Sequence, residues 1–188
     1  MEPQSETTLT ASALNVRGIR QTDSGRFPEA IASFTEALGI DPGMSGVLFN
    51  RAEAKRLSGD VDGARADILE ALRLSPGDAE FIHALGLLAY EEDNFSAAAD
   101  FYKQAIAAKA DFAQAWNDLG VIHFRKSEYA KARDCFEKAT NIDSDMAEAW
   151  FNLADTYEEL GLKAERAKAL ESLRKANLIG DYKAESRE

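Results

Sequence analysis

The fold is decided by one stretch that the chain repeats, AQAWNDLGVIHFRKSEYAKARDCFEKATNIDSDM, residues 113–146. The next stretch starts at Ala147 and begins AEAWFNLADTYEELG, so that Trp150 stands 34 residues after Trp116. An internal period of this length is the signature of a repeat architecture. Earlier copies follow at the same interval, and five units tile the chain: 11–44, 45–78, 79–112, 113–146 and 147–180.

Each unit places small and large apolar residues in the same phase. Small residues recur in the first half, as Gly18, Ala52, Gly86, Gly120 and Ala154. Large apolar residues recur in the second half, as Phe34, Ile68, Tyr102 and Phe136. Their spacing follows the period of a helix rather than the alternation of a strand. Glycines at 25, 59 and 161 separate the halves, so each unit predicts helix, tight turn, helix.

This pattern resembles the tetratricopeptide repeat family, through a W-x-x-L-G motif followed by A-x-x-x-F-x-x-A. The fullest match is Trp116, Leu119, Gly120, Ala132, Phe136 and Ala139. The resemblance covers nearly the whole chain. It implies an all-α, right-handed α-solenoid of five helix-turn-helix tetratricopeptide-type repeats. We expect one solenoid domain over residues 11–180, with tails at 1–10 and 181–188.

The chain departs from the family pattern in two places. The proline that closes a repeat is replaced by Ala110 and by Ser144. After Gly161 the fifth unit regains the pattern only if about three residues are inserted, so we expect a longer or differently placed last helix. On that helix Leu170 and Leu173 are expected to face inward.

Composition narrows the function classes. The formal charge of −11 disfavours nucleic acid and anionic membrane surfaces as partners. No apolar run is long enough to span a bilayer, and residues 1–10 do not read as a signal peptide. Cys135 is the one cysteine and cannot form an internal disulfide. We expect a cytoplasmic protein, although removal of an export signal would give the same pattern.

The family resemblance implies that the first helices line a concave groove that binds peptides or partner helices. A second stripe on each first helix, next to its packing stripe, is expected to face this groove. The candidate partner-binding residues are Asn15, Phe49, Asn50, Arg56, His83, Leu87, Tyr90, Asn117, Val121, Phe124, Phe151, Asn152, Asp155 and Glu158.

The candidate groove changes character along the chain. Apolar side chains gather in the third and fourth units, and acidic side chains in the fifth. The expected ligand is therefore a protein or peptide with one or two apolar anchors and a basic residue. Equally, the apolar residues could simply pack between adjacent first helices. The lysine, asparagine and arginine set with which some family members grip a C-terminal carboxylate is absent, because only Asn50 matches, so we expect no carboxylate-clamp chaperone binding.

No pattern of catalytic or ligand-binding chemistry accompanies the repeats. His123 lies on the packing stripe, and His83 lacks the further ligands that a metal site needs. Cys135 has no histidine close by in sequence to activate it, and no phosphate-binding glycine loop occurs. We expect no catalytic, cofactor-binding or metal-binding residues, no cofactor and no enzyme activity.

The sequence thus predicts a scaffold or adaptor for protein–protein interaction. Two alternatives use the same fold. One is an assembly or secretion-type chaperone that shields a client, and the other is a non-catalytic regulatory subunit of an enzyme.

Overall fold

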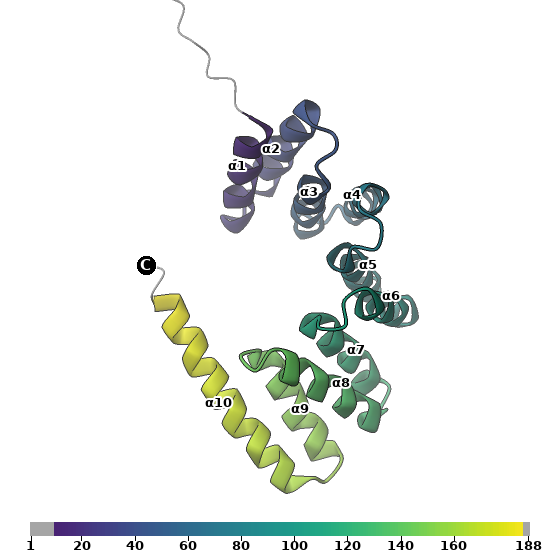
Figure 1. Ribbon diagram of the computed structural model, residues 1–188, viewed down its shortest axis with the longest axis vertical. Helices are drawn as coiled ribbons and strands as arrows, with labels where there is room; N and C mark the ends of the chain where they lie inside the picture. Colours follow the sequence, from purple (N-terminus) through teal and green to yellow (C-terminus); the bar gives the residue numbers. More distant parts are fainter. Residues whose placement is uncertain (1–9, 186–188) are drawn as a thin grey trace, which may run out of the picture. The chain divides into compact units, whose positions relative to one another are not determined.

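The computed structural model describes residues 10–185, and side chains as far as residue 177; over that range it holds ten α-helices and no strand (Figure 1). The first helices of the five repeats are α1 (Ala11–Asp23), α3 (Ser45–Leu57), α5 (Ala79–Glu91), α7 (Ala113–Arg125) and α9 (Ala147–Glu159). The second helices are α2 (Phe27–Ile40), α4 (Val61–Leu74), α6 (Phe95–Ala108), α8 (Tyr129–Ile142) and α10 (Lys163–Glu185). The fold is a helical solenoid of repeats, which confirms the predicted fold class.

The chain forms two compact units, Met1–Leu88 (unit 1) and Ala89–Glu188 (unit 2), and each is described separately. The tail expected at residues 1–10 lies outside the described residues apart from Thr10, whose side chain accepts a hydrogen bond from the backbone of Ala13 and caps α1.

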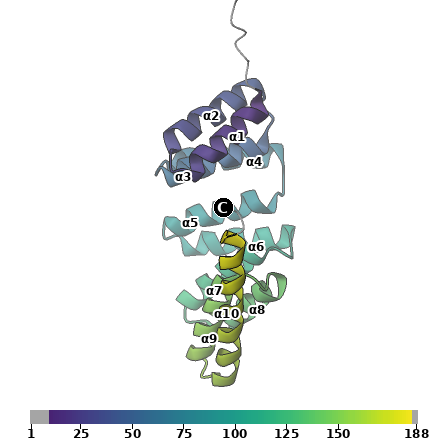
Figure 2. The same cartoon turned by 90° about the vertical axis from the view of Figure 1, so that its left-hand side faces the viewer.

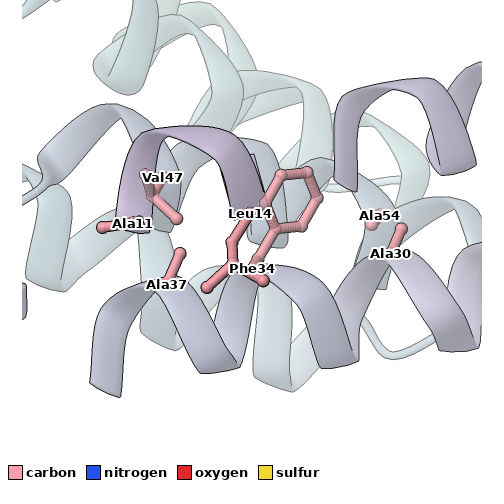
Figure 3. Close-up of a cluster of buried hydrophobic side chains, with 7 residues drawn as sticks. All are labelled: Ala11, Leu14, Ala30, Phe34, Ala37, Val47 and Ala54. Carbon is pink, nitrogen blue, oxygen red and sulfur yellow. The ribbon is translucent and has the colours of Figure 1, made fainter. Parts of the chain in front are cut away.

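The core of unit 1 is formed by buried apolar side chains of α1, α2 and α3 (Figure 3). A Cβ at Gly18 would lie 2.5 Å from the Phe34 ring, so only glycine fits there. Leu14 and Phe34 are fully buried beside each other, and Val47 and Ala54 of α3 join the same cluster. The first helix of the second repeat is thus held by the core of the first.

The core of unit 2 repeats this arrangement. A Cβ at Gly120 would lie 2.6 Å from the ring of Phe136, which is 1% exposed. Phe136 packs with Ala132 of its own helix and with Leu153 and Ala154 of α9. The same small-against-large contact therefore joins α7 to α8 and α8 to α9.

The turn inside every repeat needs one residue in the left-handed region. Its φ is 71° at Gly25, 89° at Gly59 and 70° at Gly161. The same turn position holds Asp93 at 58° and Ser127 at 57°. Glycine adopts this conformation without strain, whereas a side chain makes it costly, and serine lacks the preference for it that aspartate and asparagine show. The turns of the third and fourth repeats are therefore strained relative to the others.

The last helix is longer than its counterparts, with 23 residues against 14 in the other second helices, as the break in register predicts. Both views show α10 lying along α9 (Figures 1 and 2). Ala169 and Ala176, seven residues apart and so on one face, are its buried contacts. The expectation that Leu170 faces inward is wrong: it is 40% exposed, because it lies one residue round the helix from Ala169. Leu173 is half-buried.

Tryptophan contacts replace the closing proline where the proline is missing. The indole Nε1 of Trp116 donates to the carbonyl oxygen of Ala110 at 3.0 Å. Likewise the indole Nε1 of Trp150 donates to the carbonyl oxygen of Ser144 at 2.9 Å. Each bond ties the loop before a first helix back onto that helix. A proline would stiffen the same loop by fixing φ.

Candidate functional site

The repeat builds the same surface hollow twice, once in each unit. The hollow of unit 1 has a volume of about 150 Å³ and is lined by Ile19, Thr22, Asp23, Phe34, Asn50 and Glu53. The hollow of unit 2 has a volume of about 70 Å³ and is lined by Val121, Phe124, Arg125, Phe136, Asn152 and Asp155. Each residue of the second set stands three repeats after its counterpart in the first. We call these hollow 1 and hollow 2.

Each hollow lies where two first helices and one second helix meet. The floor of hollow 2 is the ring of Phe136 on α8, held in place against α7 by the glycine at position 120. Val121 and Phe124 come from α7, and Asn152 and Asp155 from α9. Because a helix brings residues three apart to one face, each first helix contributes such a pair to the hollow.

An arginine supported by aromatic rings forms one rim of hollow 2. The guanidinium carbon of Arg125 lies 4.4 Å from the ring centre of Phe95 and 5.9 Å from that of Tyr90. Tyr90 and Phe95 contact each other edge to face, with ring centres 5.3 Å apart. Cation–π contacts of this kind fix the direction of an otherwise flexible side chain. The arginine was not among the predicted site residues.

The two hollows differ in how their acidic residue is balanced. In hollow 1 the carboxylate of Glu53 receives two hydrogen bonds from Arg56, at 2.6 and 3.0 Å. In hollow 2 the residue that corresponds to Arg56 is Glu158. Burial and the neighbouring carboxylates of Glu158 and Glu159 raise the pKa of Asp155, and Arg166 opposes this only in part. The acidic rim of hollow 2 thus carries a carboxylate without a cation bound to it.

Glu158 has its own partner. Arg166 of α10 binds its carboxylate at 2.9 Å. Among residues 10–177 no cation forms an ion pair with Asp155. Asp155 is half-buried at the mouth of an apolar hollow, so an incoming ammonium or guanidinium group would meet a carboxylate that lacks a counterion.

Asparagine pairs join neighbouring first helices at the edge of both hollows. In unit 1 the amide of Asn50 donates to Asn15 at 3.0 Å. In unit 2 that of Asn152 donates to Asn117 at 3.0 Å, and Asn117 in turn donates to Glu148 at 3.2 Å. Asn117 is 0% exposed, so its amide holds the helices together and has no surface to offer a ligand.

Some of the remaining predicted residues pack against other side chains or are buried, and one is exposed. Phe49 stacks against Phe81, with ring centres 5.1 Å apart, and Leu87 is half-buried. His83 is only 7% exposed. By contrast, Phe151 is 52% exposed on α9 and free to contact a partner. Of the predicted set, hollow 2 brings together Val121, Phe124, Asn152 and Asp155.

A buried ion network in unit 1 escaped the sequence reasoning. Asp67 accepts hydrogen bonds from Arg51 at 2.7 and 2.8 Å and pairs with Lys55 at 2.8 Å. A signal was available within the chain. Arg17 and Ser33, one repeat earlier, form the matching pair at 2.9 Å, and the later repeats place leucine at the arginine position. The arginine and its polar partner thus change together along the chain.

The described residues hold no cluster of metal-binding side chains. Burial, and to a smaller degree Asp134, raises the pKa of the Cys135 thiol to about 11, which keeps it protonated and unreactive at neutral pH. His123 hydrogen-bonds Glu128 at 2.6 Å within its own repeat. Among the helices that the structure describes, none is long and apolar enough to cross a membrane.

Comparison with known proteins agrees with this architecture. A family model described as tetratricopeptide repeat matches residues 16–79 and 83–147, and a second of the same description matches 147–177. Tetratricopeptide repeat protein 36 of Mus musculus is 35% identical over 101 residues, which is 50% of this chain and 54% of that protein. DnaJ protein P58IPK homolog B of Oryza sativa subsp. japonica is 40% identical over 96 residues, 49% of this chain but 20% of that protein. The matched part therefore spans about half or less of these relatives.

Solved structures resemble the fold at low identity. The crystal structure of MamA superimposes with a TM-score of 0.70 and 24% identity, covering 88% of this chain and 96% of that one. PilF of Pseudomonas aeruginosa gives a TM-score of 0.80 at 17% identity, covering 88% of this chain and 76% of that one. YrrB, described as carrying an unusual peptide-binding site, gives 0.60 at 20% identity, covering 91% and 87%. At these identities the likeness establishes the fold alone.

Proposed function

The chain belongs to the tetratricopeptide repeat family, and from that premise we propose that it is a scaffold whose unit 2 binds a partner protein through hollow 2. Proteins of this family are generally non-catalytic scaffolds for protein interaction. The proposed ligand is a segment that places a small aliphatic side chain next to a lysine or arginine. The peptide-binding site named for YrrB, which has the same fold, makes a peptide ligand reasonable.

The volume of hollow 2 sets the size of the apolar anchor. A cavity of about 150 Å³ accommodates benzene. The 70 Å³ of hollow 2 are therefore suited to a smaller group, such as the end of a valine or leucine side chain. The exposed Phe151 on α9 extends the apolar contact outside the hollow. An anchor buried in such a pocket supplies most of the binding energy of a short segment.

The unpaired carboxylate of Asp155 is the observation that carries the proposal. It supports a cation beside the anchor, because Glu158 stands where the matching hollow has an arginine. Arg125 on the opposite rim, held by its aromatic neighbours, would repel a cation placed on that side. A ligand with one aliphatic and one basic residue would thus bind in a single direction.

The test uses short fluorescent peptides that carry one valine and one lysine at varied separations on a neutral background. Fluorescence polarisation should detect binding to the whole chain, and peptides with glutamate in place of lysine should bind more weakly. Asp155→Asn should weaken binding of the best peptide by about threefold to tenfold. Glu53→Gln alters the corresponding carboxylate of hollow 1 and serves as the matched control.

Equal losses in both variants, or none with Asp155→Asn, would contradict the proposal. Val121→Thr, which replaces one methyl group by a hydroxyl of similar size, tests the apolar lining separately. A chaperone would instead keep an aggregating client in solution, and a regulatory subunit would change the rate of one enzyme. Those two measurements distinguish the alternatives from an adaptor.

A further inference from the structure

The first repeat exposes a face that is buried in every later repeat. In α3 this face carries Val47 and Ala54, which are 1% and 0% exposed and join the core of the first repeat. The matching residues of α1 are Ala13 and Arg20, and both are exposed. Within unit 1 no described helix is packed on that side of α1. The face of α1 therefore carries arginine at the position where α3 carries the buried Ala54.

This face forms a hollow of about 460 Å³ on unit 1, which we call the end hollow. It is lined by Ala13, Val16, Arg17, Arg20, Gln21 and Arg26. The lining thus contains three arginines and no carboxylate, in a chain whose formal charge is −11. Val16 adds an apolar contact, since it is 47% exposed. The volume is within the range of pockets that hold ligands.

One wall of the end hollow is fixed by hydrogen bonds. Arg17 donates to Ser33 at 2.9 Å and pairs with Glu36 at 3.0 Å, and Ser33 donates to Gln21 at 2.7 Å. This network satisfies Arg17 and holds it in place. It also leaves the positive charge of the hollow to the other two arginines.

The guanidinium groups of Arg20 and Arg26 have no ion-pair or hydrogen-bond partner among the described residues. Arg20 comes from the last turn of α1, and Arg26 from the turn between α1 and α2. Two guanidinium groups at one hollow suit carboxylates, which they can bind through paired hydrogen bonds.

We infer that the end hollow is a second docking site, which binds an acidic segment of a partner protein that also carries an aliphatic side chain. Arg20 and Arg26 bind its carboxylates, and Val16 contacts its aliphatic group. The charge preference is opposite to that of hollow 2. The two sites therefore accept different segments, and the chain can hold both at once.

The experiment measures fluorescence polarisation of short peptides that contain several glutamates and one leucine, with the whole chain in low-salt buffer. We expect these peptides to bind, and binding to weaken as salt screens the charges. Arg20→Glu/Arg26→Glu should weaken binding by at least about tenfold. Arg20→Lys/Arg26→Lys should retain most of it. Asp155→Asn should leave it unchanged, which separates this result from the fate of the function proposed for hollow 2.

Lys103→Glu/Lys131→Glu is the matched control, since it changes the net charge by the same amount at two exposed lysines outside unit 1. An equal loss in that control would overturn the inference, because attraction would then be general to the chain. Failure of wild type to bind any acidic peptide would also overturn it. The inference would also be overturned if sedimentation showed a concentration-dependent oligomer that dissociates in Arg20→Glu/Arg26→Glu. The occupant of the end hollow would then be a second copy of the chain.

Discussion

Gly120→Ala tests the packing between α7 and α8. The added Cβ would lie 2.6, 2.8 and 2.9 Å from three carbons of the Phe136 ring, whereas ordinary contacts begin at 3.4 Å. The ring must therefore retreat by about 0.8 Å, against the buried residues Ala132 and Leu153 that pack with it. Overpacking of this kind costs about 1–3 kcal/mol. Alanine recovers about 1 kcal/mol of helix propensity, so the expected net loss is about 1 kcal/mol.

Gly46→Ala is the matched control, because Gly46 is also in a first helix and a Cβ there would meet nothing within 4 Å. It should leave the stability unchanged or raise it by up to about 1 kcal/mol. The free energy of unfolding is measured by urea titration with far-UV circular dichroism, after checking that the slope is unchanged. For a chain of this size the melting temperature should fall by about 2–4 °C with Gly120→Ala.

A double-mutant cycle identifies the cause. Phe136→Leu shortens the side chain that the new methyl group would meet, so Gly120→Ala should cost less in that background than in the wild type. Equal shifts for Gly120→Ala and Gly46→Ala, or simple additivity with Phe136→Leu, would refute the packing argument.

Three further outcomes are expected. Asp67→Asn should lower the free energy of unfolding by about 3–5 kcal/mol at neutral pH, because it leaves Arg51 and Lys55 without their carboxylate. Burial alone would raise the pKa of Asp67, but hydrogen bonds from both cations outweigh it and lower the pKa. This stabilisation is therefore present above about pH 4 and is lost as pH falls through the folded-state pKa. Urea titrations at several pH values should show the difference in free energy of unfolding between wild type and Asp67→Asn becoming smaller in acid. Iodoacetamide at about pH 8 should label Cys135 at least tenfold more slowly in the folded chain than in urea, and equal rates would contradict its burial. Ser127→Gly should raise the free energy of unfolding by up to about 1 kcal/mol, because it relieves a positive φ, and a loss would show that the turn is not strained.

The repeat and its core were accessible from the sequence because they are periodic. Gly18 and Gly120 mark the close approach of two helices, and the aromatic rings that face them, Phe34 and Phe136, stand at the same phase of their repeats. The length of α10 also followed, since the pattern after Gly161 does not fit the period of the other units.

Which side chains lie on the surface was harder to predict, because the packing stripe and the groove stripe are adjacent on the same helix. Asn117 was assigned to the groove, yet it is fully buried between first helices. Leu170 was assigned to the interior, yet a shift of one residue turns it outward. The aromatic support of Arg125 depends on rings from α5 and α6, and no period of the sequence links an arginine to them.

The two tryptophans that bond to the loops lacking the closing proline also provide an intrinsic fluorescence signal. Trp116 and Trp150, the only tryptophans, both lie in unit 2, and so do all five tyrosines. Intrinsic fluorescence therefore monitors unit 2 alone, whereas far-UV circular dichroism sums the helices of both units. Unfolding curves that coincide would mean one cooperative transition, and curves that separate would mean that the units melt in turn. Where the curves separate, an unlabelled sample can assign a destabilising substitution to the unit in which it acts.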